Sequence, residues 1–345
     1  MPRAATLRDL AQTLDLSVAT VSRSLNGHPH VAEPTRRRVV NAAKKAGYHP
    51  NALARALRTE ETNLVGLVVP DIRSSFFASA ASILQKVLEE NGYRVILCIS
   101  HEDETIDRDY LLSLLELRVD GIVHVPCTPG GAKFIRDAGS FTPLVELNRH
   151  SYETIFDSFT ADDRDGAFEL TKYLIGLDHR RIAMIAGPKA ISTTRDRASG
   201  FEEACSSANL DETVVRYGDF SSQSSFETVL ELMNQPLPPT AIFASSNQLV
   251  IGALRACAEL RLDIPRDVSL IGFDDAEWYS LCSPPLTTYS LPLEQMGMMA
   301  AQLLVSRMTS VPLRDTAPRR ATHCRLSGRF IERGSCAAPS TSEAR

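Results

Sequence analysis

Short apolar runs alternate with helical stretches along most of this 345-residue chain, and this alternation most strongly constrains its fold. The first apolar runs, each long enough for a buried strand, are residues 64–70, 94–100, 121–126 and 143–147. Their helical stretches lie near residues 76–91, 104–117 and 130–139. A second set of runs, 181–188, 213–218, 240–245 and 268–275, alternates with helical stretches near 164–176, 195–208, 222–233 and 248–260. Repeated strand–helix units predict two doubly wound, parallel α/β sheets.

Polar segments follow the predicted strands, and they are PDIRSSFF, NRH, GPKAISTTRDR, GDF, SSNQ and GFDD. In doubly wound sheets, ligands bind outside the carboxyl ends of the strands. The polar segments therefore predict a ligand site in the crevice between the two sheets.

The first fifty residues have a different pattern. Thr6 and Asp9 have the spacing of a capping box, and an apolar stripe follows at helical spacing, formed by Leu7, Leu10, Ala11 and Leu14. Ser17 stands where the N-cap of a second helix, Val18–Leu25, belongs. Two short helices around a tight turn indicate a helix-turn-helix.

A third helix is predicted to begin near Pro34 and to end near Gly47. Its apolar residues Val39, Val40 and Ala43 are expected to complete a small three-helix core. Its other face carries the positive charges of Arg36, Arg37, Arg38, Lys44 and Lys45.

Charge is distributed unevenly along the chain. Residues 1–60 contain ten Lys and Arg against four Asp and Glu, a net charge of +6, whereas the remainder has a net charge of −11. A basic segment on an acidic body is typical of phosphate binding confined to one end. On composition alone, a solvated helical bundle without a role for its charges is the alternative.

Several classes of protein lack support in the sequence. The seven cysteines are scattered in mostly apolar contexts and are expected to be reduced core residues: Cys98, Cys127, Cys205, Cys257, Cys282, Cys324 and Cys336. No signal peptide follows Met1, and no stretch approaches the length of a membrane span. We therefore expect a soluble, cytoplasmic protein that associates with the nucleoid.

Enzyme and metal signatures are equally weak. The chain has no G-x-S-x-G, phosphate-loop or H-E-x-x-H motif. A fragment of a calcium loop is suggested by Asp162, Asp163, Asp165 and Gly166, but the ligand spacing and the closing glutamate are wrong, so these acids fit a helix N-terminus better. We expect no catalytic residues, no cofactor and no metal.

The run TLRDLAQTLDLSVATVSRSLNG and the later run HVAEPTRRRVVNAAKKAGYHPNALARALRT resemble the DNA-binding head and hinge helix of the lactose repressor (LacI/GalR) family. The resemblance continues to about Ser335 and includes IGFDDAEWYSLCSPPLTTYSLPLEQMG. It implies an N-terminal all-α helix-turn-helix head and hinge helix joined to an α/β core similar to periplasmic binding proteins.

In that family the second helix enters the major groove, which implies base contacts from Val18, Ala19 and Arg23. Phosphate contacts are implied for Thr6, Ser17, Thr20, Ser22, His30 and Tyr48. Val18 and Ala19 offer only apolar contact, for instance to a thymine methyl group, whereas Arg23 can pair bidentately with guanine.

A hinge helix is predicted to follow the head. Asn51 is expected to cap about two helical turns, which are too short to be stable alone. The resemblance implies that two such helices of a dimer pack in the minor groove, where Leu57 wedges between base pairs, aided by Leu53 and Ala54. The alternative is an interdomain helix that packs on the core.

The resemblance implies an effector pocket formed by Asp71, Phe76, Asn148, Thr193, Arg197, Phe220, Asn247 and Asp274, with aromatic faces against a small ring and polar groups on its hydroxyls. Other interpretations remain open. Phe76 and Phe220 are alternatively core residues, Asp71 a helix cap, and Arg197 a surface partner of Asp196 or Glu202.

The sequence departs from the family pattern at one pocket position. Where the family often has Asn-Asp, this chain has Ser246-Asn247, so a carboxylate that binds sugar hydroxyls is lost. Arg73 and Arg149 near the same mouth would favour an acidic ligand such as a sugar acid.

These observations predict a helix-turn-helix head at residues 1–49, a hinge at 50–61, a core at 62–336 and a disordered tail at 337–345. Within the core, an N-subdomain is expected at about 62–161 and 291–322, and a C-subdomain at about 162–290 and 323–336. The C-terminal leucine-repeat tail of the lactose repressor has no counterpart after Cys336, so we expect a dimer and not a tetramer.

We therefore expect a homodimeric, sequence-specific transcriptional regulator, most simply a repressor, on a near-palindromic DNA operator. A small-molecule effector, a sugar or sugar acid, would melt the marginal hinge helices by changing the angle between the lobes. Control by a corepressor or a phosphocarrier protein is an alternative, as is a sugar-binding protein without a regulatory role.

Overall fold

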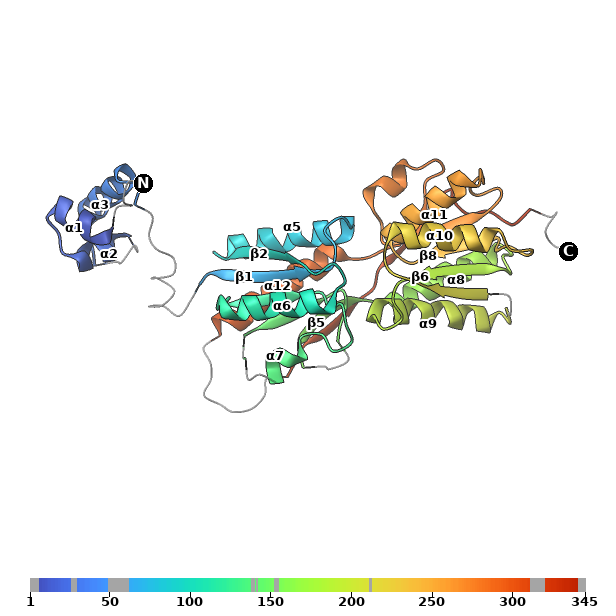
Figure 1. Ribbon diagram of the computed structural model, residues 1–345, viewed down its shortest axis with the longest axis horizontal. Coiled ribbons are helices and arrows are strands. Elements are labelled where there is room, and N and C mark those ends of the chain that lie inside the picture. The colour runs from blue at the N-terminus through green and yellow to red at the C-terminus, as the bar shows by residue number, and fades with distance from the viewer. Residues whose placement is uncertain are drawn as a thin grey trace. The chain divides into compact units, whose positions relative to one another are not determined.

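The computed structural model describes residues 6–25, 30–48, 62–137, 140, 142–151, 155–210, 213–310 and 320–340. The chain forms two compact units, Met1–Thr62 and Asn63–Arg345, which we call the head and the core (Figure 1). The hinge residues Asn51, Leu53, Ala54 and Leu57 lie outside the described residues, so the roles predicted for them remain predictions.

The head contains three helices, α1 (Leu7–Leu14), α2 (Val18–Leu25) and α3 (Glu33–Lys45). The predicted capping box is present at the start of α1, where Asp9 N donates to Thr6 Oγ1 (3.3 Å) and Thr6 N donates to Asp9 Oδ2 (2.8 Å). The helices bury one small core, formed by Leu10, Ala11, Leu14, Val21, Val39 and Ala43.

One expectation for α3 was wrong. Val40 is 38% exposed instead of buried, because the positions that face the core are Val39 and Ala43, four residues apart on the same side of the helix. Arg38 is exposed, as expected for the basic face, and its Nη2 also donates to Leu14 O (2.9 Å) at the end of α1. Arg38 therefore holds two helices of the head together.

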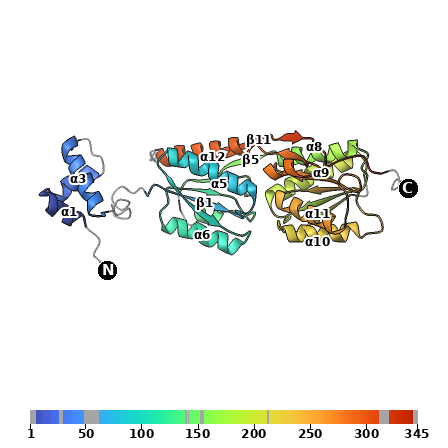
Figure 2. The ribbon, with the colours of Figure 1, turned by 90° about the horizontal axis from the view of Figure 1, so that it is seen from above.

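The first sheet of the core has the strand order β11-β5-β4-β3-β1-β2 and is parallel throughout. Its strands are β1 (Leu64–Val69), β2 (Arg94–Ile99), β3 (Gly121–His124), β4 (Leu144–Leu147), β5 (Asp157–Ala161) and β11 (His323–Leu326). Figure 2 shows helices on both faces of this N-lobe: α5 (Ser75–Glu90) and α12 (Leu293–Thr309) on one, and α6 (Glu104–Glu116) on the other. The short helix α7 (Lys133–Asp137) packs on the α6 side.

The second sheet, the C-lobe, has the order β12-β10-β9-β8-β6-β7. Its strands are β6 (Ile182–Ala186), β7 (Thr213–Tyr217), β8 (Ala241–Ala244), β9 (Ser269–Phe273), β10 (Thr287–Ser290) and the antiparallel β12 (Arg329–Ile331). Helices α8 (Asp163–Gly176) and α9 (Ser192–Ser207) cover one face, and α10 (Ser222–Met233) and α11 (Asn247–Glu259) cover the other (Figure 2). A 3-10 helix, η1 (Glu277–Leu281), follows β9. The two predicted doubly wound sheets are confirmed.

The boundary expected between the subdomains near residue 323 was wrong. β11 pairs with β5 of the N-lobe, with His323 opposite Ser158, and the chain enters the C-lobe only at β12. The expected tail also begins too early, because Ala337 N donates to Ser269 Oγ (3.0 Å).

Six of the described elements had no expectation in the sequence. β5 carries the polar sequence DSFTA, yet all five of its residues are buried between β4 and β11. The others are α12, which packs on α5, the 3-10 helix η1, the strand β10 and the edge strands β11 and β12. Among the described residues, no helix is long and apolar enough to cross a membrane.

Candidate functional site

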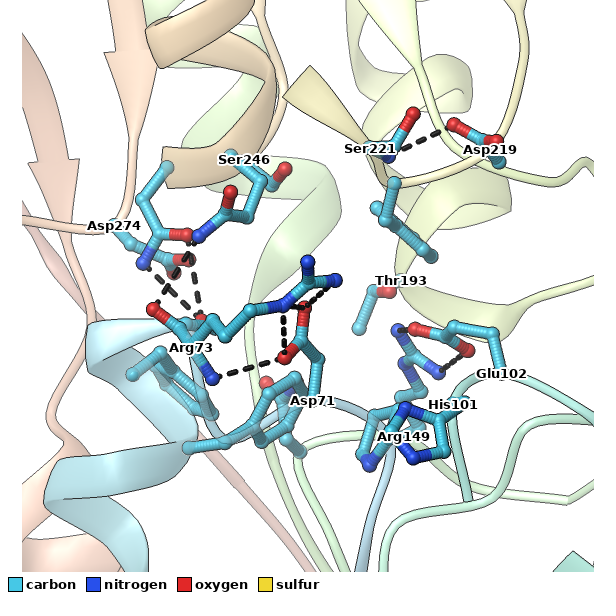
Figure 3. Close-up of a pocket in the computed structure, with 18 of the residues that line it drawn as sticks. Asp71, Arg73, His101, Glu102, Arg149, Thr193, Asp219, Ser221, Ser246 and Asp274 are labelled. Carbon is cyan, nitrogen blue, oxygen red and sulfur yellow. Dashed lines mark hydrogen bonds and ion pairs between the residues drawn. The ribbon is translucent and has the colours of Figure 1, made fainter. Parts of the chain in front are cut away.

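The carboxyl ends of the strands of both lobes surround a cavity of about 180 Å³. All eight residues predicted for the effector pocket line it: Asp71, Phe76, Asn148, Thr193, Arg197, Phe220, Asn247 and Asp274. Among its other lining residues are Arg73, Ser74, Phe77, His101, Glu102, Arg149, Asp219, Ser221, Ser246 and Gln248 (Figure 3). The sequence therefore predicted correctly which strand ends come together here.

Asn148 and Asp274 occupy equivalent places in the two lobes. Asn148 follows β4 and Asp274 follows β9, and these strands hold the same position in their sheets. Both have left-handed backbones, with φ of 64° and 67°, a conformation that Asn and Asp tolerate better than most residues. The Oδ1 atom of each is buried and accepts no hydrogen bond from any residue that the structure describes. Two unused acceptors thus belong to residues that line the cavity from opposite lobes.

Arg197 is held inside the C-lobe wall. It is 4% exposed, its Nε donates to Asp163 Oδ1 (2.7 Å), its Nη1 donates to Ser245 O, and its Cζ lies 3.9 Å from the Phe273 ring centroid. Burial raises the pKa of Asp163 to about 6, and the nearby Arg197 opposes this shift. The surface pairing with Asp196 or Glu202 considered for Arg197 is thus replaced by a buried pair.

Arg149 is held in the N-lobe wall in a similar manner. Its Nη1 and Nη2 donate to the two carboxylate oxygens of Glu102, each at 2.7 Å, and its Nη1 also donates to Pro126 O (3.3 Å). Its Cζ lies 4.8 Å from the Phe220 centroid of the C-lobe and 5.8 Å from that of Phe77. Arg149 is 3% exposed, whereas the Glu102 side chain is 25% exposed.

A third ion pair lies at the mouth of the cavity. Arg73 Nη2 donates to Asp71 Oδ2 (2.9 Å), and Arg73 N donates to Asp71 Oδ1 (2.9 Å). Although burial acts in the opposite direction, the hydrogen bonds from Arg73 hold the pKa of Asp71 below its ordinary value. The Asp71 side chain therefore bonds Arg73 instead of capping α5.

Asp274 has no such partner. Its carboxyl group is desolvated, which raises its pKa, and Arg197 opposes this shift by charge alone. An unpaired carboxyl group at a cavity wall is costly unless a ligand donates hydrogen bonds to it.

Asn247 links the two lobes directly. Its Nδ2 donates to Ser75 Oγ (3.0 Å), and its amide lies 3.3 Å from Ser74 Oγ at the start of α5. Gln248 Nε2 donates to Arg73 O (3.3 Å) beside it. Asn247, which the sequence placed on the ligand, is thus engaged with the opposite lobe.

Aromatic rings form the apolar part of the wall. Phe76 and Phe77 meet edge to face at 5.2 Å and belong to the N-lobe core, and both rings also line the cavity. Phe220 comes from the loop after β7 and fills the space above Gly187, where an added Cβ would lie 2.3 Å from its ring. The two interpretations of Phe76 and Phe220, as core residues or as pocket residues, are therefore both correct, because these rings pack in the core and also line the cavity.

The residues predicted to read DNA differ in their exposure. Val18, Ala19 and Arg23 are exposed on α2, with Val18 42% exposed. Ser17 caps the helix, since its Oγ accepts from Thr20 N (3.0 Å) and bonds Thr20 Oγ1 (2.8 Å). His30 is exposed, Ser22 is half-buried, and Tyr48 packs against the head core.

Sequence reasoning missed two residues that hold the cavity wall. Glu102 follows β2, so the rule of strand carboxyl ends would have found it. Asp163 was placed only at a helix N-terminus, because nothing local shows that its partner Arg197 lies 34 residues away.

Both units of the chain are similar to known proteins. Residues 6–51 match the bacterial regulatory proteins of the lacI family, and residues 171–336 match a periplasmic binding protein-like domain. The HTH-type transcriptional repressor PurR of Photorhabdus laumondii is 32% identical over 328 residues, covering 93% of this chain and 95% of that protein.

Two solved structures have the same fold. The Lac repressor dimer bound to operator and the anti-inducer ONPF has a TM-score of 0.84 at 25% identity, covering 97% of this chain and all of that one. A LacI family transcriptional regulator from Enterococcus faecium with bound ribose has a TM-score of 0.70 at 26% identity, covering 80% of this chain and 100% of that one. Because it is 32% identical to PurR over 93% of its length, this chain belongs to the LacI family of bacterial regulatory proteins and is a DNA-binding transcriptional regulator.

Proposed function

We propose that the cavity binds an uncharged, hydroxyl-rich single-ring molecule, a monosaccharide, and that this binding changes the affinity of the dimer for its operator. The observation that carries the proposal is the pair of unused acceptors, Asn148 Oδ1 and Asp274 Oδ1, at equivalent positions in the two lobes. A ligand that donates hydroxyl groups to both would stabilise one relative placement of the lobes.

The size of the cavity supports a single ring. A cavity of roughly 150 Å³ holds one benzene molecule, and this cavity measures about 180 Å³. The rings of Phe76, Phe77 and Phe220 offer apolar faces to such a ligand, while the polar groups at the strand ends fix its orientation.

Charge favours an uncharged ligand over a sugar acid. Each arginine that lines the cavity already pairs with a carboxylate: Arg73 with Asp71, Arg149 with Glu102 and Arg197 with Asp163. The acidic ligand that Arg73 and Arg149 suggested would have to compete with these carboxylates. Asp274 adds an unpaired carboxyl group that would repel an anion.

The relatives support the same assignment. The Enterococcus faecium regulator binds ribose, an uncharged sugar, within the same fold, and the Lac repressor binds its operator as a dimer. We infer that this chain also acts as a homodimer on a near-palindromic operator in the cytoplasm, without enzymatic activity.

We infer that DNA reading lies in the head and the segment after it. Val18 and Ala19 would contact thymine methyl groups and Arg23 a guanine, because these exposed side chains share one surface of α2. Residues 50–61 would form the hinge, with Leu57 as the wedge.

Calorimetry with the full-length protein tests the ligand class. D-ribose, D-glucose and D-galactose are titrated together with uridine and hypoxanthine, and we expect one of the sugars to bind. Binding of a nucleoside or nucleobase with no response to any sugar would contradict the monosaccharide assignment.

A further inference from the structure

We propose that Glu102 sets the charge selectivity of the cavity: by neutralising Arg149 it excludes anionic ligands and admits uncharged ones. This inference rests on the proposed function, because it concerns the ligand of the same cavity. It assigns Glu102 a role in specificity that does not require direct contact with the ligand.

The first step is the geometry of the pair. The two carboxylate oxygens of Glu102 each accept from a different nitrogen of Arg149 at 2.7 Å. Such bidentate, charge-assisted pairs are among the strongest hydrogen-bonded contacts in proteins. Both side chains line the cavity, and Figure 3 labels the pair together with Thr193 and His101, which also line the cavity.

The second step is the burial of Arg149. Its guanidinium is 3% exposed and lies over the rings of Phe77 and Phe220. A buried guanidinium without its carboxylate attracts anions strongly, because little water screens it. Glu102 is the only carboxylate that pairs with Arg149 among the described residues, so the neutralisation of this guanidinium depends on Glu102.

The third step is the backbone that presents Glu102. His101 and Glu102 are consecutive non-glycine residues with φ of 56° and 59°, in a turn closed by Asp103 N donating to Ser100 O (2.9 Å). Two left-handed residues in this arrangement usually include glycine, asparagine or aspartate. His101 and Glu102 adopt it at a conformational cost, which the contact between Glu102 and Arg149 offsets.

Other charges near the pair do not replace this function. Arg73 already pairs with Asp71, and Arg197 pairs with Asp163 inside the C-lobe. Removing the charge of Glu102 would therefore leave Arg149 as the one unneutralised guanidinium of the described cavity wall, whereas removing Arg149 would leave Glu102 as an additional unpaired carboxylate.

The experiment exploits these opposite consequences. Full-length wild type, Glu102→Gln, Arg149→Gln and the double variant are titrated by calorimetry with D-glucose, D-glucuronate and D-glucosamine, and with D-galactose and D-galacturonate, because these acids keep the sugar ring. Glu104→Gln is the matched control, because it removes the same charge from an exposed position that does not line the cavity. Circular dichroism confirms that each variant is folded.

We expect Glu102→Gln to improve the affinity for glucuronate or galacturonate relative to the uncharged parent sugar by about tenfold. Arg149→Gln should shift preference towards glucosamine by a similar factor. The double variant should return to the selectivity of the wild type, and Glu104→Gln should not differ from it. If one single variant fails to fold, the opposite shift in the other still tests the inference.

Two results would overturn the inference: no relative gain for the acids in Glu102→Gln, or a gain that persists in the double variant. Failure of the proposed function looks different. If wild type binds no sugar but Glu102→Gln gains an acid through Arg149, the ligand class is wrong and the role of Glu102 stands.

Discussion

The two lobes each bury one arginine beside the cavity, but they neutralise it differently. Arg197 and Arg149 both stack on aromatic rings, both donate to a backbone carbonyl, and both pair with one carboxylate. The partner of Arg197 is Asp163, which is 3% exposed at the start of α8. The partner of Arg149 is Glu102, which is 25% exposed in a loop.

The difference indicates that the lobes have different roles in the site. In the C-lobe, both charges of the pair are removed from water, so the pair is part of the packed interior and its loss would damage the lobe itself. In the N-lobe, one partner remains at the cavity surface, so its loss would change the charge that a ligand meets. Similar contacts therefore serve stability in one lobe and selectivity in the other.

The sharpest test of this contrast removes each carboxylate in turn. Asp163→Ala should destabilise the core by about 3–5 kcal/mol, because it leaves Arg197 buried without a partner. Glu102→Ala should cost only about 1–2 kcal/mol, since Glu102 is already partly solvated and Arg149 keeps its hydrogen bond to Pro126 O. Urea unfolding of the two variants measures both, and equal costs would remove the distinction between the pairs.

A second prediction concerns the pH dependence of the C-lobe. His179 is 1% exposed and its ring bonds Thr240 Oγ1 (2.8 Å) and Ser269 Oγ (3.0 Å). Burial lowers the pKa of His179 from 6.5 to about 4. Between these values the unfolded chain binds a proton that the folded protein does not, so stability falls as pH drops, by up to about 3 kcal/mol at pH 4.

His179→Gln should reduce the change of the urea-unfolding midpoint between pH 6.5 and pH 4, because glutamine does not titrate in this range. The same acid-dependent loss in wild type and variant would exclude His179 as its cause.

The third prediction concerns Asp274, the unpaired acceptor in the C-lobe wall of the cavity. Asp274→Gly should weaken sugar binding by about 10–100-fold, since it removes a charged hydrogen-bond acceptor. Glycine keeps the left-handed backbone free of strain. The ligand-free core should not lose stability, because an unpartnered, desolvated carboxyl group is removed with the side chain.

The fourth and smallest effect is expected for Asn148→Gly, the matched change in the N-lobe. Loss of a neutral acceptor should weaken sugar binding by only about 2–10-fold. Calorimetry on both glycine variants compares the two acceptors directly, and a larger loss for Asn148→Gly would place the dominant ligand contact in the N-lobe.

Much of this architecture was predictable from the sequence. The apolar runs gave eight of the core strands because parallel strands covered on both faces are almost continuously apolar. The eight residues assigned to the pocket line one cavity because the carboxyl ends of such strands meet there.

The sequence did not predict features that depend on tertiary partners. β5 has a polar sequence, and its strand conformation depends on pairing with β4 and β11. The sequence of β11 does not show that this strand pairs with β5, which lies more than 160 residues earlier in the chain. Asp163 looked like a helix N-terminal acid, and its role depends on Arg197 from the next helix. Val40 lies on the exposed side of α3, although its apolar side chain predicted a buried position.

Operator binding by wild type and Asp274→Gly tests most directly whether the cavity controls the head. DNA upstream of the protein's own and neighbouring genes is titrated with each protein, with and without the sugar that calorimetry identifies. We predict equal DNA affinity for both proteins without sugar, and a change of affinity on adding sugar in wild type only. The same sugar response in both proteins, or none in either despite measured sugar binding, would contradict the account.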